Sequence, residues 1–206
     1  YDPEFKTKLR ITEEYEKNVK GKIFPKKMLS SVKVDNGMTI MVNGEEQYPI
    51  QIVSPLYLPS EESVTLCQHL IKDFAAAGVT LASPCVGHMS YWIEEGKYDW
   101  DKYDKTIESI LKSNPNALLM VYFYLVPPAW FINKYPDELE KYYAGDDSNE
   151  LKTWTASAPL TSDKWRKLSL ACLEEVIRHT ENSSYANHVY GYVVGGGDSA
   201  EWFWPA

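Results

Sequence analysis

The stretch ALLMVYFYLV, residues 117–126, is the longest run of apolar and aromatic residues in the chain. A strand of this composition is covered on both faces, which is typical of a parallel strand inside an α/β domain. Asn114-Pro115 precedes the run and Pro127-Pro128 follows it, and proline is confined to the ends of such strands. The run therefore predicts a central parallel strand, around which the other elements must be arranged.

Strands and helices alternate on both sides of this run. The first predicted helix carries an apolar stripe, formed by Leu66, Leu70, Ile71 and Phe74, and Gly78 ends it. A long loop over 129–161 contains a possible short helix at 136–143. The predicted strands are 48–53, 79–83, 117–126 and 188–194, and the predicted helices are 60–77, 101–112 and 162–180.

Such alternation implies parallel strands joined by right-handed crossovers, in either a doubly wound sheet or a (β/α)8 TIM barrel. No glycine-rich phosphate turn follows the first strand, and Gly195-Gly196-Gly197 comes too late for a dinucleotide fingerprint. The barrel is therefore favoured, and the chain covers roughly its first four β/α units.

A β-hairpin is expected to precede the barrel strands. Residues 38–42 and 47–53 are β-rich and are separated by Asn43-Gly44, the pair that two-residue hairpin turns prefer. The domain organisation predicted is a helical or irregular lead-in over 1–37, with a helix near 5–20, and the N-terminal half of a catalytic barrel over 38–206.

Composition excludes several classes of function. The net charge is −8 and no basic patch interleaves with aromatic residues, so nucleic acid is not an expected partner. The three cysteines and four histidines show no metal-ligand spacing, so neither a metal nor another cofactor is expected. No apolar run is long enough for a membrane span. The compartment stays open, with a secreted or periplasmic location slightly favoured.

The residues after each predicted strand have the composition of a sugar cleft. Barrel enzymes carry their chemistry at the carboxyl ends of the strands. Aromatic faces beside a few hydrogen-bonding groups suit sugar rings, which offer both C–H surfaces and hydroxyls. The predicted site residues are His88, Tyr91, Trp92, Trp130, Asp198, Ser199, Glu201 and Trp202.

Four fragments, in this order and spacing, resemble the first half of clan A glycoside hydrolases, and the β-galactosidase-like families in particular. They are GEEQYPIQIVSP, EEGKYDWDKYDKTIESI, LVPPAWF and HVYGYVVGGGDSAEWFW, and the resemblance covers residues 38–206. The resemblance implies a hydrolase that acts on a β-linked sugar, with retention of configuration and with a glutamate after the fourth strand as the acid/base. That position is Glu201.

The neighbours of Glu201 fit an acid that must stay protonated near neutral pH, because Trp202, Phe203 and Trp204 follow it. Asp198 competes for the role but resembles a turn residue after three glycines. An exposed loop glutamate is the alternative interpretation of Glu201. Clan A enzymes carry asparagine before the acid/base, whereas this chain has Ala200, so Ser199, Asp198 or a group from elsewhere would have to contact the sugar instead.

A purely structural role is an alternative interpretation of the other predicted site residues as well. His88 fits a sugar contact or a structural histidine equally well, and Trp130 fits either a platform at the rim or a plug over the barrel top. Tyr91 and Trp92 lie in a predicted loop, where large aromatic residues are more often functional than structural.

The resemblance also implies a second carboxylate near a seventh strand, so the fold needs a C-terminal half-barrel, from the same chain or from a second copy. Two other functions remain open: a non-catalytic carbohydrate-binding barrel or inactive fragment, which Ala200 favours, and a barrel enzyme of another class, such as a lyase or an isomerase.

Overall fold

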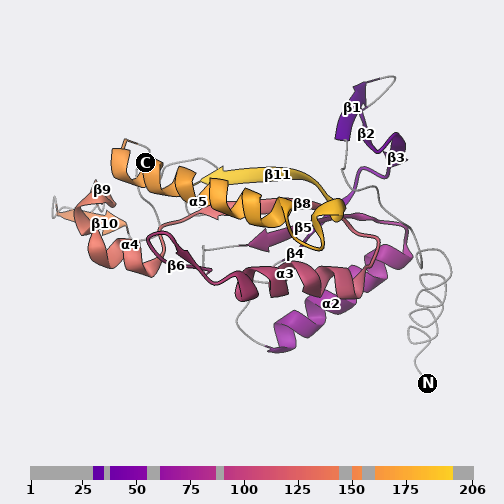
Figure 1. The fold of residues 1–206 in the computed structure, drawn as a ribbon, viewed down its shortest axis with the longest axis horizontal. Helices are drawn as coiled ribbons and strands as arrows, with labels where there is room; N and C mark the ends of the chain where they lie inside the picture. Colours follow the sequence, from indigo (N-terminus) through magenta and orange to yellow (C-terminus); the bar gives the residue numbers. More distant parts are fainter. Residues whose placement is uncertain are drawn as a thin grey trace. The chain divides into compact units, whose positions relative to one another are not determined.

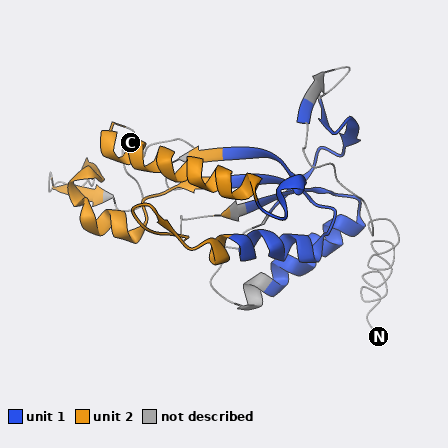
Figure 2. Ribbon diagram, in the orientation of Figure 1, with its two compact units in different colours: residues 1–85, 104–122, 183–193 blue, residues 86–103, 123–182, 194–206 orange. Residues whose placement is uncertain are grey.

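The computed structural model describes residues 30–34, 38–54, 61–86, 91–143, 150–154 and 161–196. The expected helix near 5–20 lies outside these residues. The chain divides into two compact units (Figure 2). Unit 1 comprises residues 1–85, 104–122 and 183–193, and unit 2 comprises residues 86–103, 123–182 and 194–206.

A four-stranded sheet carries the predicted α/β alternation (Figure 1). Its strands lie in the order β11-β8-β5-β4, so consecutive strands are neighbours. β4 and β5 pair in parallel, with Gln51 opposite Leu81. The strands are β4 (Gln51–Ser54), β5 (Leu81–Val86), β8 (Leu118–Leu125) and β11 (Val189–Gly196), and the helices between them are α2 (Glu61–Ala76), α3 (Trp100–Ser113) and α5 (Asp163–Glu181).

The central strand β8 is buried as its composition predicts. Leu119, Val121 and Phe123 have no exposed surface, and the alternating residues Tyr122 and Tyr124 are half-buried. A strand with both faces at least partly covered is what a parallel α/β sheet requires. The α/β class predicted from this run is therefore confirmed.

The β-hairpin predicted ahead of the four-stranded sheet forms with the expected turn, but its second strand differs from the prediction. β2 (Met38–Val42) pairs antiparallel with β3 (Glu45–Gln47), and Asn43 and Gly44 both have positive φ (54° and 80°). This is the two-residue turn that an Asn-Gly pair forms. The expected strand 47–53 is instead divided between β3 and β4, with Pro49 between them, since proline lacks the N–H that a strand interior needs.

A further strand, β1 (Ser30–Val34), lies within the expected lead-in and pairs with β2. The core of unit 1 joins this small sheet to the large one. It contains Val42, Leu81, Leu118 and Tyr190, with Ile40 and Met120 packed against them. The Ser30 hydroxyl also donates a hydrogen bond to the Tyr190 carbonyl at 2.9 Å.

Helix α2 ends as predicted but does not bury its whole predicted stripe. Gly78 has φ 89°, its N–H bonds the Ala75 carbonyl, and the N–H of Val79 bonds the Phe74 carbonyl. These two bonds form a Schellman C-cap. Ile71 is buried together with Cys67, whereas the other three stripe residues are exposed, namely Leu66, Leu70 and Phe74.

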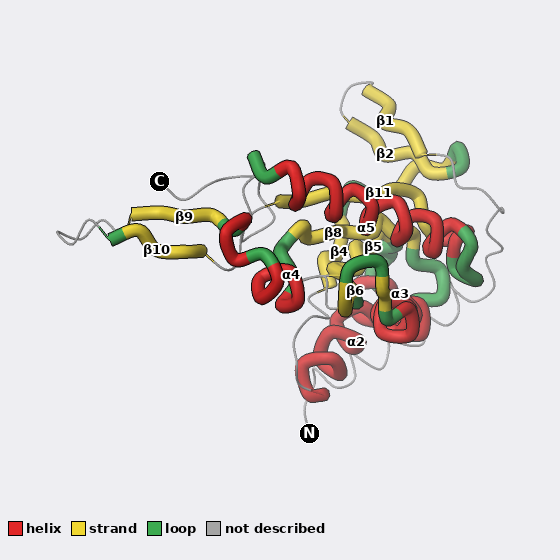
Figure 3. The backbone as a smooth tube through the Cα atoms, turned by 60° about the vertical axis from the view of Figure 1, so that its left-hand side comes forward, coloured by secondary structure: helices red, strands yellow, loops and turns green. Residues whose placement is uncertain are grey.

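Unit 2 contains several short elements in segments that the sequence predicts to be loops (Figure 3). The predicted short helix at 136–143 is wrong, because only a 3-10 turn, η2 (Pro136–Glu138), forms there and a strand follows it. The elements are β6 (Trp92–Glu94), β7 (Lys97–Tyr98), α4 (Ala129–Lys134), β9 (Glu140–Tyr143) and β10 (Leu151–Trp154). One further 3-10 turn, η3 (Ala186–His188), precedes β11 in unit 1.

Candidate active site

Three of the eight predicted site residues fall within the described structure, and all three belong to unit 2. Tyr91 and Trp92 lie at the start of the β6–β7 hairpin, which follows β5. Trp130 lies in the first turn of α4, which follows β8. The remaining five lie outside the described residues, namely His88, Asp198, Ser199, Glu201 and Trp202.

Trp92 and Trp130 come together in an aromatic cluster. Their ring centroids are 5.0 Å apart in an edge-to-face arrangement, and Trp165 of α5 stacks on Trp92 at 6.2 Å. Phe131 joins the cluster with its ring 4.9 Å from Trp165. Each such ring pair adds about 0.5–1.5 kcal/mol beyond the area it buries. The cluster therefore fixes the β6–β7 hairpin against α4 and α5.

The two tryptophans differ in how much of the side chain is exposed. Trp92 is 2% exposed, so its ring is fully engaged in packing, whereas Trp130 is half-buried and keeps part of its ring accessible. Direct sugar contact by Trp130 agrees with this exposure, and it remains a prediction. A role for Trp92 in the site would be indirect, through the placement of Trp130.

Tyr91 is equally buried and packs on a different group of residues. Its ring lies edge-to-face with Tyr103 at 5.2 Å, and its hydroxyl faces the buried thiol of Cys172. Burial raises the pKa of Tyr91 well above its usual value, and it raises the pKa of the Cys172 thiol to about 12. Both groups are therefore neutral at physiological pH, and sugar contact by Tyr91 likewise stays a prediction.

The two tryptophans share an unusual feature, which is an unpaired indole N–H. The Nε1 atoms of Trp92 and Trp130 are both buried and have no hydrogen-bond acceptor among the residues that the structure describes. Buried polar groups are nearly always hydrogen-bonded. Each of these N–H groups can only donate, so a hydroxyl, carbonyl or carboxylate oxygen from outside the described residues would satisfy it.

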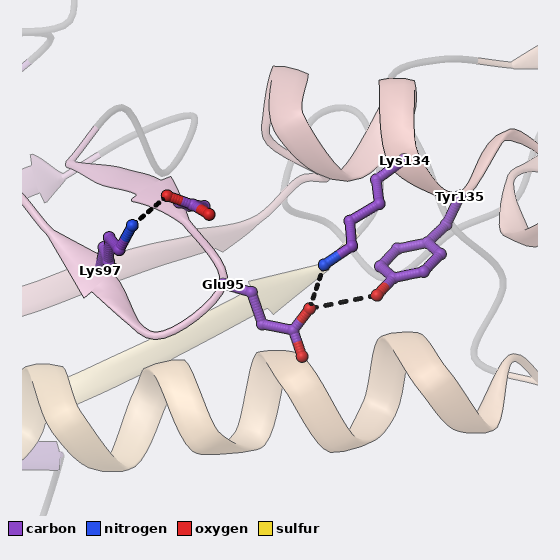
Figure 4. Close-up of polar contacts among 5 residues, drawn as sticks. Glu95, Lys97, Lys134 and Tyr135 are labelled. Atoms are coloured by element: carbon purple, nitrogen blue, oxygen red, sulfur yellow. Dashed lines mark hydrogen bonds and ion pairs between the residues drawn. The ribbon is translucent and has the colours of Figure 1, made fainter.

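The turn of the β6–β7 hairpin is tied to the end of α4 by a polar cluster (Figure 4). The Glu95 carboxylate accepts hydrogen bonds from Lys134 Nζ at 2.8 Å and from the Tyr135 hydroxyl at 3.1 Å. Lys164 Nζ lies 4.3 Å from the centroid of the Tyr135 ring. These contacts hold the far end of the short helix that carries Trp130.

The charges in this cluster do not fit a general acid. Hydrogen bonding to Lys134 lowers the pKa of Glu95, and hydrogen bonding to Lys97 lowers the pKa of Glu94. A catalytic acid needs a raised pKa so that it holds its proton near neutral pH. Glu94 and Glu95 are therefore structural carboxylates, and Glu201 stays the predicted acid.

The long connection between β8 and α5 is closed by a capping interaction. The Ser162 hydroxyl accepts a hydrogen bond from the Trp165 N–H at 3.0 Å and donates one to the Glu138 carboxylate. Ser162 is thus the N-cap of α5, at the position where the sequence predicts the helix to begin. The cap places Trp165 in the first turn, from which it reaches Trp92.

Sequence reasoning missed the partners that hold the predicted residues in place. Trp165 and Phe131 lie in predicted helical or loop segments, and their apolar character was the available signal. Within the described residues no group of three His, Cys, Asp or Glu side chains could hold a metal ion. Nor does any helix in those residues have the length and apolar character to cross a membrane.

Comparison with known proteins assigns the family. The profile of a glycoside hydrolase family described as β-galactosidase, family 42, matches residues 57–192. No curated protein sequence matches the chain.

Several solved β-galactosidases share structural similarity with the chain. The enzyme from Bacillus circulans sp. alkalophilus is 16% identical with a TM-score of 0.46, over 73% of this chain and 21% of that one. A catalytic mutant of Gan42B, a GH42 β-galactosidase from G. stearothermophilus, is 15% identical with a TM-score of 0.45, over 69% and 20%. The cold-adapted enzyme from Rahnella sp. R3 is 19% identical with a TM-score of 0.42, over 71% and 20%.

The aligned part thus spans about a fifth of the length of these solved enzymes. The profile match covers most of the chain, from the residues after β4 into β11. The chain belongs to the β-galactosidase family of glycoside hydrolases, family 42.

Proposed function

We propose that the protein is a glycoside hydrolase that cleaves a β-linked galactoside, with Glu201 as the general acid/base. The observation that carries the proposal is the family match over residues 57–192, which ends in β11, the strand that leads toward Glu201. In glycoside hydrolysis one carboxylic acid protonates the leaving oxygen while a second carboxylate attacks the sugar or activates water. The aromatic residues that follow Glu201 in the sequence would raise its pKa by excluding water.

Trp130 would form part of the sugar site in this proposal. Its partly exposed ring offers an apolar face to a pyranose. His88, Asp198, Ser199 and Trp202 would contribute from the other strand ends. In place of the asparagine that clan A enzymes carry before the acid/base, Ser199 or Asp198 would bind the sugar hydroxyl.

We also propose that the four-stranded sheet is part of a (β/α)8 barrel whose further units supply the second carboxylate. The support is the apolar surface of unit 1. Strand β4 lies at the edge of the sheet with Val53 53% exposed, and α2 presents Leu66, 60% exposed, on a stripe with Leu70 and Phe74. Parallel strands in α/β domains are covered on both faces, so further β/α units would cover this surface.

A carbohydrate-binding barrel without catalytic activity is the second candidate. Ala200 favours it, because alanine cannot make the hydrogen bond to the sugar that asparagine makes before the acid/base. The two candidates share the aromatic site and differ only in turnover.

The variant Glu201→Gln separates the candidates in the full-length protein. Turnover of an alkyl β-galactoside, whose leaving group needs protonation, should fall about 10²- to 10⁴-fold in the enzyme. Galactose affinity, measured by titration calorimetry, should stay unchanged. The control is Glu94→Gln, an exposed carboxylate bound to Lys97, which should keep full turnover. A wild-type protein that binds galactose without turnover would instead be a binding module.

A further inference from the structure

Helix α4 is too short to fix its own orientation. It has six residues, and its N-cap is Pro128, whose side chain has no polar atom to cap the first turn. Helices of this length are marginal in water, so tertiary contacts must set how the helix lies. Trp130, the partly exposed ring of the proposed sugar site, lies in the first turn. Any rotation of α4 about its axis would therefore move the Trp130 ring.

Two contacts fix one face of α4 against the β6–β7 hairpin. Trp130 and Lys134 are four residues apart, so both side chains project from the same face of the helix. The Trp130 ring meets the ring of Trp92 at 5.0 Å, and Lys134 Nζ meets the Glu95 carboxylate at 2.8 Å (Figure 4). A helix held at two points about 6 Å apart along its axis cannot rotate without breaking one of the contacts.

The hairpin holds Glu95 in a defined place. A backbone hydrogen bond of 2.7 Å from the Asp99 N–H to the Tyr91 carbonyl closes the base of the hairpin. Its turn consists of Glu95 and Gly96, and Gly96 has φ 70°, a conformation that glycine adopts without strain. The turn therefore presents the Glu95 carboxylate from a fixed backbone.

The exposure of the ion pair distinguishes a positioning role from a stabilising one. The Glu95 and Lys134 side chains are 41% and 53% exposed. Ion pairs this exposed add little to the free energy of unfolding, because water already solvates both charges. Hydrogen bonds from Lys134 and Tyr135 lower the pKa of Glu95, so the carboxylate stays charged near neutral pH. Loss of the pair would thus leave the protein folded and would release only α4.

We propose that Glu95 is a positioning residue for the sugar site, because its bond to Lys134 sets the orientation of α4 and so holds the Trp130 ring where it meets the galactoside. This inference rests on the proposed function, in which Trp130 contacts the sugar. Glu95 acts only through Trp130 in this role. An interaction that serves substrate and transition state equally changes KM and leaves kcat unchanged.

The first test compares two neighbouring carboxylates in the full-length protein. Glu95→Ala should raise KM for a nitrophenyl β-galactoside and the Kd of galactose about 3- to 5-fold, the range that an exposed ion pair allows. Its kcat and its urea midpoint of unfolding should stay at the wild-type values. Glu94→Ala is the matched control, because this carboxylate binds Lys97 within the hairpin, and it should change none of these quantities.

Two double variants test the route through Lys134 and Trp130. The exchange Glu95→Lys/Lys134→Glu should recover most of the lost affinity, because it rebuilds the ion pair with reversed charges. Trp130→Ala alone should raise KM at least as much as Glu95→Ala. Adding Glu95→Ala to Trp130→Ala should have no further effect, since residues that act through one another are not additive.

Salt provides a readout that a purely structural role would not give. A galactoside is neutral, so its own binding offers no charge to screen. Exposed ion pairs weaken as ionic strength rises, so KM of the wild type should increase between about 0.05 and about 0.5 M NaCl. KM of Glu95→Ala should not change over the same range.

The outcomes distinguish this inference from the proposed function. An unchanged KM in Glu95→Ala, an additive loss in the Trp130→Ala background, or equal salt dependence in both proteins would overturn the inference while the hydrolase stands. A urea midpoint that falls as KM rises would also overturn it, because Glu95 would then only stabilise the fold. A wild-type protein that neither binds galactose nor hydrolyses the galactoside would overturn the proposed function, and this inference with it.

Discussion

At the scale of single residues, two buried tyrosines differ in whether the hydroxyl has a partner. The Tyr190 hydroxyl is buried with no partner in the described part of the chain, and burial raises its pKa to about 12. Tyr103 shares a hydrogen bond of 2.7 Å with Thr180. Tyr190→Phe should therefore raise the free energy of unfolding by about 1 kcal/mol, because it removes an unsatisfied polar group, and Tyr103→Phe should lower it by about 1 kcal/mol. Urea denaturation of both variants measures the difference, and a loss of stability in Tyr190→Phe would show that its hydroxyl has a partner, such as a bound water.

The burial of His188 predicts how the free energy of unfolding changes as the pH falls. Burial lowers the pKa of His188 below its usual 6.5, while its ring nitrogen Nδ1 lies 3.1 Å from the Ala117 carbonyl. The unfolded chain then binds the proton at a higher pH than the folded one, so stability falls as the pH drops below 6.5. In His188→Gln this dependence should be weaker, and denaturation at pH 7.5 and 5.5 for both proteins measures the change. If the free energy of unfolding falls equally between the two pH values in both proteins, groups other than His188 cause the acid sensitivity.

The candidate site shows which residue properties a sequence reveals. Tyr91, Trp92 and Trp130 are predicted site residues because they are aromatic and follow predicted strands, and the structure places Trp92 and Trp130 in contact. Their different burial could not be predicted, because it depends on Trp165, which reaches Trp92 from a helix more than seventy residues later in the chain. Residue type and strand order indicate the neighbourhood of a site, and packing decides which faces remain accessible.

At the scale of elements, glycine conformation predicts a difference between two substitutions. Gly78, in the C-cap of α2, has φ 89° and open space where an alanine methyl group would project, so Gly78→Ala costs only backbone strain, about 1–2 kcal/mol. Gly191, in β11, has no positive φ, and an added methyl would meet Met120 at an ordinary 3.6 Å. Gly191→Ala should therefore change stability by less than about 0.5 kcal/mol. Thermal unfolding compares the two, and equal effects would contradict the role given to the C-cap.

The elements that could be predicted are those whose own sequence specifies them. β8 has a long apolar run between prolines, and α5 has the Ser162 cap and a helical apolar pattern, so both occur where expected. β1 and the β9–β10 hairpin were missed, since short strands depend on the partner they pair with more than on their own composition. The Asn43-Gly44 turn is the exception, because its two residues dictate the conformation themselves.

At the scale of the whole molecule, exposed apolar surface on unit 1 carries the argument for further β/α units. The sequence pattern of α2 predicts a single apolar stripe, yet the structure buries Ile71 and exposes Leu66, Leu70 and Phe74. A helix with apolar residues on two sides packs against two partners in a barrel, namely its own sheet and a neighbouring helix. The surplus apolar residues of α2 therefore indicate a second contact surface.

The proposed barrel thus predicts that a charge on this surface destabilises the full-length protein. If further units cover α2, Leu66→Lys buries an unpaired ammonium group and should lower the free energy of unfolding by about 3 kcal/mol or more. Ile93→Lys places the same charge at a similarly exposed position in β6, where no cover is proposed, and it should cost less than about 0.5 kcal/mol. Chemical denaturation of the two variants measures the contrast, and hydrogen exchange of the α2 amides in the wild type provides a second readout. Equal small effects of both substitutions, with fast exchange along α2, would mean that this surface faces water in the complete protein and that the sheet closes no barrel at the β4 edge.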